Sequence, residues 1–113
     1  MPKIYLSPST QDWNMYVTGS GSEEYNMNLL ADALVPYLLS NGIQYQRNRP
    51  EMTAGSSIRE ANQGEYDLYL ALHSNAAPEG RYGEERGIIA FYYPGSVGGQ
   101  RAAELIAQEL RKI

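Results

Sequence analysis

The only histidine in the chain, His73, stands where the apolar run "LYLAL" gives way to a turn of small and polar residues, "HSNAAPEG". Histidine is the commonest metal-binding side chain and a frequent general acid or base. A histidine at a strand end can also be a hydrogen-bonded structural residue, and position alone favours that role. Asn75, two residues further on, could orient the histidine loop, bind a substrate or close a turn with its side-chain amide.

Two carboxylates, Glu23 and Glu24, begin an apolar pattern of helical spacing. Carboxylates in the first turn of a helix are favoured by the helix dipole, and Ser20 with Glu23, in the order S-x-x-E, can form a capping box. Capping is the role that the local sequence favours. The chain has no cysteine, so any metal must be held by imidazole, carboxylate, carbonyl or water oxygen.

The elements that would position these residues alternate along the chain. Periodicity predicts strands at residues 3–6, 43–48, 66–72 and 87–95, and helices at 23–41, 56–62 and 96–113. Pro36 predicts a kink or an early end in the first helix. This order predicts a single α/β domain with a mostly parallel sheet, helices on both faces, and residues 66–72 as an inner strand. Ligands in such sheets bind beyond the carboxyl ends of the strands, where His73 and a long polar loop at residues 7–22 both fall.

Charge and hydropathy exclude two classes of partner. The net charge of -4 argues against nucleic acid, because a protein that neutralises phosphates needs a basic face. No segment approaches the roughly 20 apolar residues of a membrane span. The N-terminus "MPKIYLSPST" also lacks the apolar core of a signal peptide.

Several segments together resemble the zinc-dependent N-acetylmuramoyl-L-alanine amidases of the amidase 3 family, which are cell-wall hydrolases. The segments are "KIYLSP", "GSEEYNMNLLADALVPYLLSNGI", "RNRPEM", "SIREAN", "YDLYLALHSNAAPEG" and "GIIAFYYPGS". The most specific piece, "LHSNA", is similar to the family's strand-end H-x-N-A signature. The resemblance implies the family's fold and an enzyme that cleaves peptidoglycan between N-acetylmuramic acid and the L-alanine of the stem peptide.

The family holds zinc with two histidines and one glutamate. The resemblance implies that His73 is the strand-end ligand. Counting back from Gly42 without gaps places the glutamate ligand at Glu23, whereas Glu24 would need a slip of one residue. In "SPSTQD", Thr10 stands where the family has its first histidine, and Gln11 or Asp12 could offer a metal only oxygen.

The family's general-base glutamate lies on a strand after the last helix, and this sequence ends at Ile113, so no residue here corresponds to it. We therefore expect an amidase 3-like catalytic domain, residues 1–113, that is C-terminally incomplete. It is either a fragment or a shortened relative that has lost the chemistry. The expected function is peptidoglycan hydrolysis by a zinc-activated water. The alternative is a non-catalytic relative that binds muropeptides or serves as an interaction module. A chain without a signal peptide suits a phage endolysin or a fragment of an exported enzyme.

Overall fold

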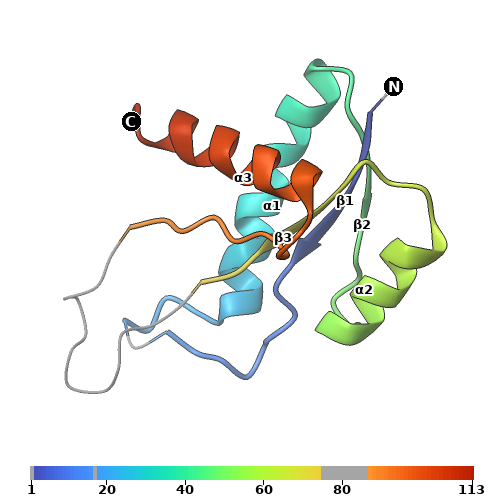
Figure 1. Ribbon diagram of the computed structural model, residues 1–113. Helices are drawn as coiled ribbons and strands as arrows, with labels where there is room; N and C mark the ends of the chain where they lie inside the picture. The colour runs from blue at the N-terminus through green and yellow to red at the C-terminus, as the bar shows by residue number, and fades with distance from the viewer. Residues whose placement is uncertain (1, 17, 75–86) are drawn as a thin grey trace. The chain divides into compact units, whose positions relative to one another are not determined.

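The structure is a computed structural model that describes residues 2–16, 18–74 and 87–113. It has a small α/β architecture with a three-stranded parallel sheet and three helices (Figure 1). By its internal contacts the chain divides into two compact units, Met1–Ser74 and Asn75–Ile113.

The first unit holds the sheet. Its strands are β1 (Lys3–Pro8), β2 (Gln44–Arg47) and β3 (Leu68–Leu72), in the order β2-β1-β3. Both pairs are parallel, as the sequence predicted. The prediction that the third strand is an inner one was wrong for the described sheet, in which β1 is central. Because only one described strand pairs with β3, its leucines stay partly exposed.

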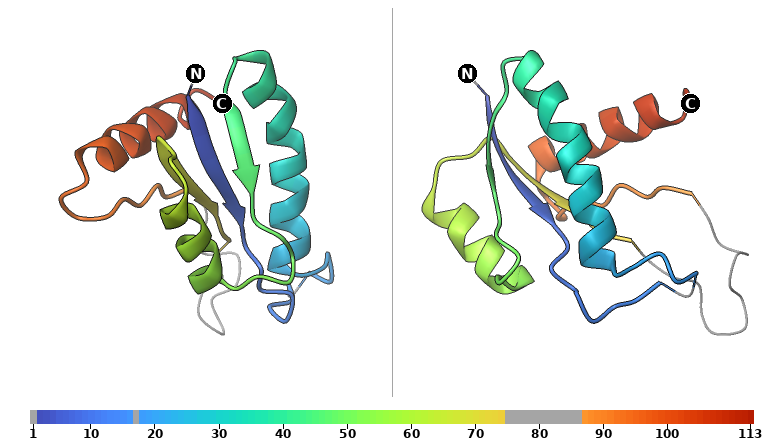
Figure 2. Two further views of the ribbon diagram at one scale, coloured as in Figure 1. Left: turned by 90° about the vertical axis from the view of Figure 1, so that its right-hand side faces the viewer. Right: turned by 180° about the vertical axis from the view of Figure 1, so that it is seen from behind.

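Two helices of the first unit, α1 (Glu23–Ser40) and α2 (Ala54–Gln63), cover opposite faces of the sheet (Figure 2). Side chains alternate between the faces of a strand, so Ile4 and Leu6 of β1 point one way and Tyr5 the other. Ile4 and Leu6 form an apolar core with residues of α1. Tyr5 is completely buried on the opposite face, where its hydroxyl donates to Glu60 of α2 at 2.9 Å.

The start and the proline of α1 differ from the prediction. Ser22 is the N-cap, and its Oγ accepts from the backbone N–H of Tyr25 at 3.0 Å, so the predicted capping box of Ser20 and Glu23 was wrong. The helix continues through Pro36 to Ser40, so an early end was also wrong. Pro36 and Asp32 are both exposed, and water can therefore bond the carbonyl that the proline leaves without a donor.

The second unit contains α3 (Val97–Leu110), whose N-cap Ser96 accepts from Gly99 N–H at 3.1 Å. The strand predicted at residues 87–95 is absent, since none of those residues is in a strand. Ile88, Ile89 and Phe91 are exposed, and none of them pairs with a described strand. Among the described helices, none has the length and apolar character needed to cross a bilayer.

Candidate functional site

Glu23 and His73 meet at the carboxyl edge of the sheet. Glu23 is the first residue of α1, and only 2% of it is exposed, which is unusual for a carboxylate. His73 directly follows β3, and its side chain is 45% exposed. His73 Nδ1 lies 3.2 Å from Glu23 Oε1. A buried acceptor and an accessible imidazole are therefore in direct contact.

Two further polar groups hold the Glu23 carboxylate in place, and a third bond fixes the backbone of Glu23. The backbone N–H of Ser74 donates to Oε1 at 2.9 Å, and Asn14 Nδ2 donates to Oε2 at 3.0 Å. Glu23 N–H in turn donates to the carbonyl of Asn14 at 2.8 Å. These bonds join the polar loop, the start of α1 and the end of β3.

The polar loop folds back on itself to bring Asn14 beside Glu23. Met15 and Ser22 form an isolated antiparallel bridge, which puts their neighbours Asn14 and Glu23 side by side. Tyr16 from the same loop shares a hydrogen bond of 2.6 Å between its hydroxyl and Ser74 Oγ. The loop is thus tied to the histidine turn as well as to the helix.

The structure brings together the two residues that the resemblance implies as metal ligands. Glu23 contacts His73, while the neighbouring Glu24 is partly exposed and has no hydrogen bond to the histidine turn among the described residues. Their role as metal ligands stays a prediction. Asn75, the other polar residue singled out in this turn, lies outside the described residues.

Two ligand atoms on one tetrahedral zinc, each roughly 2.1 Å from the metal, lie about 3.4 Å apart. The 3.2 Å between His73 Nδ1 and Glu23 Oε1 fits that spacing, and it also fits a direct hydrogen bond. Within residues 2–16, 18–74 and 87–113, no three histidine, aspartate or glutamate side chains are grouped to hold a metal. Thr10 has a hydroxyl where the resemblance implies an imidazole. The described residues thus fit two positions of a zinc shell and leave it incomplete.

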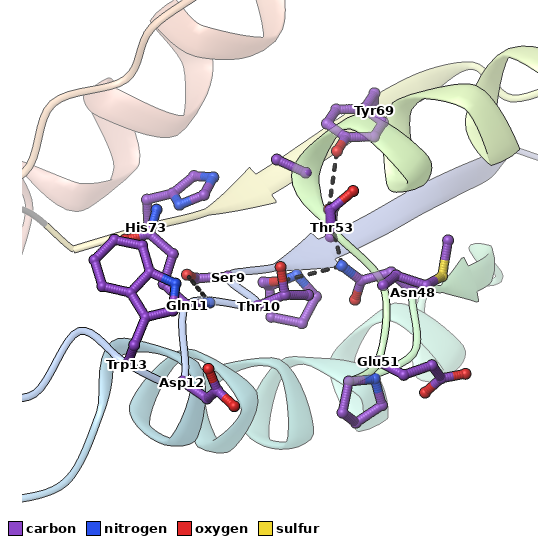
Figure 3. A pocket seen from close by; sticks show the side chains of 15 residues that line it. Ser9, Thr10, Gln11, Asp12, Trp13, Asn48, Glu51, Thr53, Tyr69 and His73 are labelled. Atoms are coloured by element: carbon purple, nitrogen blue, oxygen red, sulfur yellow. Dashed lines mark hydrogen bonds between the residues drawn. The ribbon is translucent and has the colours of Figure 1, made fainter.

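A pocket of about 420 Å³ adjoins this site in the first unit. Its lining includes His73 and all three residues considered for the missing ligand, Thr10, Gln11 and Asp12 (Figure 3). Gln11 Oε1 accepts from Asn14 Nδ2 at 3.2 Å, so the Gln11 side chain helps to hold Asn14 beside Glu23. A small molecule that approaches the imidazole of His73 from the pocket would therefore also meet Thr10, Gln11 and Asp12.

A buried polar network underlies the pocket. Asn48, which is 7% exposed, directs its Nδ2 to Ser7 Oγ, the Pro8 carbonyl and Ser57 Oγ, each at 3.1 Å. Tyr69 donates its hydroxyl to Ser7 Oγ at 2.9 Å. Nothing in the sequence pattern marked Asn48. The long polar loop did signal a functional segment, but it did not single out Asn14 or Tyr16.

Tyr5, which stacks on the pocket residue Tyr69, and Glu51, which lines the pocket, have shifted pKa values. Burial raises the pKa of Tyr5, and the hydrogen bond to Glu60 with the charge of that carboxylate raises it further. The pKa of Glu51 is lowered by a hydrogen bond from the backbone N–H of Glu51 itself, and the hydrogen bond from Arg49 lowers it further. Arg49 Nε lies 2.9 Å from Glu51 Oε1. Glu51 therefore stays a carboxylate at the pocket rim near neutral pH.

Comparisons with protein-family models, curated proteins and solved structures found no match to this chain.

Proposed function

We propose that this chain is a peptidoglycan hydrolase domain that cleaves the amide between N-acetylmuramic acid and the L-alanine of the stem peptide. The observation that supports it most is the contact between His73 and Glu23, at 3.2 Å. They are 50 residues apart in sequence. The resemblance to the amidase 3 family names the same two residues as zinc ligands.

Glu23 and His73 are the residues that would hold zinc. A bound zinc ion supplies a Lewis acid and lowers the pKa of its water toward neutrality. The chain's own groups act by positioning. Ser74 N–H and Asn14 Nδ2 orient the Glu23 carboxylate, whose Oε1 lies 3.2 Å from His73 Nδ1. The accessible side of the imidazole then faces the substrate.

A second candidate function is binding of muropeptides without turnover. Thr10 favours it, because a glutamate and one histidine form a weaker zinc site than the three protein ligands usual in catalytic centres. The described residues contain no three-residue group that would complete the shell. In this second candidate the chain binds the same muropeptide but does not hydrolyse it.

The two candidates are separated by measuring the release of new peptide amino groups from purified cell walls with zinc supplied. Hydrolysis is supported if the wild-type chain releases amino groups, His73→Ala does not, and Glu24→Gln does. Glu24→Gln is the matched control, because it removes a carboxylate from the same helical turn outside the His73 contact.

Binding without turnover is supported if no amino groups appear but the chain sediments with the cell walls. Both candidates fail if the folded chain neither cleaves nor binds the walls. Activity that survives His73→Ala would also count against the hydrolytic assignment, since the reaction would then not need the proposed ligand.

A further inference from the structure

The pocket beside His73 has walls of unlike character. Figure 3 shows Trp13 and His73 on one side, and Asn48 and Glu51 on the other. Trp13 is 75% exposed, so a large flat apolar surface stands free at the rim. Such a ring has an apolar face available for stacking against a ligand.

The floor of the pocket offers neutral hydrogen-bonding groups. Asn48 Nδ2 is occupied by its three acceptors, but no donor among the described residues contacts Asn48 Oδ1. Ser7 Oγ accepts from both Asn48 and Tyr69, which fills its acceptor positions and leaves its own proton to donate. One acceptor and one donor are thus available for a ligand, on residues that are 7% and 5% exposed.

The charges around the pocket disfavour an anionic ligand. Asp12 and Glu51 are carboxylates, and none of the described lining residues is a lysine or arginine. Arg49, outside the lining, pairs with Glu51 and also with Glu60 at 3.2 Å, so its charge is directed to protein carboxylates. The pocket therefore suits a neutral ligand with hydroxyl and amide groups.

We propose that this pocket binds an N-acetylated amino sugar of the glycan strand, and that the stem peptide lies outside it. The Trp13 ring stacks on the apolar face of the sugar, the rim carboxylates accept from its hydroxyls, and Asn48 and Ser7 bond its polar substituents. A stem peptide carries free carboxylates, and the described lining holds no lysine or arginine to pair with them. The choice of peptidoglycan as the source of the sugar rests on the proposed function.

Trp13 is the only tryptophan in the chain, so its fluorescence reports directly on this pocket. The experiment titrates the metal-free chain with tri-N-acetylchitotriose and, separately, with the tripeptide L-alanyl-γ-D-glutamyl-L-lysine. We expect a saturable change in Trp13 fluorescence with the saccharide and none with the tripeptide. Calorimetry with the same saccharide then measures Trp13→Ala, for which we expect affinity to fall about tenfold or more.

Tyr37→Ala is the matched control, because Tyr37 is an aromatic residue 69% exposed on α1 that does not line the pocket. This variant is expected to keep the wild-type affinity. The proposal is overturned if neither probe binds, if only the tripeptide binds, or if Trp13→Ala binds the saccharide as tightly as the wild type does.

The outcome is independent of the test for hydrolysis. Saccharide binding without release of amino groups from cell walls supports the sugar pocket and counts against turnover. Release of amino groups without saccharide binding overturns the sugar pocket and leaves the hydrolytic proposal standing.

Discussion

Replacing Glu23 by glutamine tests whether the buried carboxylate organises the site. The carboxylate has only acceptors, and each oxygen faces an N–H group: Oε1 faces Ser74 N–H and Oε2 faces Asn14 Nδ2. A glutamine side chain has one acceptor and one donor. While the Asn14 amide keeps its orientation, an amide N–H₂ group must face a donor in either orientation of Glu23→Gln.

The cost can be worked out from these contacts. One hydrogen bond is lost and leaves a buried donor without a partner, which costs about 1–3 kcal/mol. The bond that remains changes from charged to neutral, which costs about 1 kcal/mol more. We expect Glu23→Gln to lower the free energy of unfolding by about 2–4 kcal/mol. Glu24→Gln also removes a negative charge from the first turn and should cost only about 0.3–1 kcal/mol.

Equilibrium unfolding in urea, followed by circular dichroism, measures all three chains. Adding Asn14→Asp to Glu23→Gln gives the new amide donor an acceptor, so the double variant should recover at least about 1 kcal/mol relative to the single one. The reasoning is refuted if Glu23→Gln is no less stable than Glu24→Gln. It is also refuted if Asn14→Asp lowers stability equally with and without Glu23→Gln.

Three further predictions concern other parts of the first unit. Wild-type chain should bind zinc weakly, and Thr10→His should tighten binding; unchanged affinity by calorimetry would show that residue 10 does not reach the metal. The raised pKa of Tyr5 means that the unfolded chain loses this proton first, so stability should fall as the pH rises above about 10. Tyr5→Phe should make that fall shallower, and an identical alkaline profile would contradict the assignment. Asn48→Ala should cost about 1–3 kcal/mol in urea unfolding, whereas Asn62→Ala, at an exposed position of α2, should cost little; equal losses would contradict a role for the buried network.

Strands and helices with strong local signals were predictable from the sequence. The alternation of Ile4, Tyr5 and Leu6 and the period of α1 follow from which side chains face the core, so local pattern determines them. The apolar run at residues 87–95 also predicts a strand, but it forms none. A strand needs a neighbour for its backbone hydrogen bonds, and that neighbour is not encoded in the segment itself.

The candidate site was predictable only in part. The contact between Glu23 and His73 was expected from the resemblance, whereas spacing alone favoured a capping role for Glu23. Ser22 takes the cap instead, which leaves Glu23 free to turn inward. Asn14 could not be predicted, because its place depends on a bridge between Met15 and Ser22 that has no sequence signature.

The register of the sheet explains why residue 10 is the informative position. Pro8 of β1 is in register with Leu72 of β3, and Ser9 N–H donates to the Leu72 carbonyl at 2.9 Å. The parallel pairing therefore extends one residue beyond β1 and carries Thr10 and His73 to the same edge. Since consecutive side chains of an extended chain point in opposite directions, the turn after Ser9 decides whether residue 10 faces the imidazole. The zinc affinity of Thr10→His would thus show whether the turn after Ser9 directs residue 10 toward His73, which the strand pairing alone does not determine.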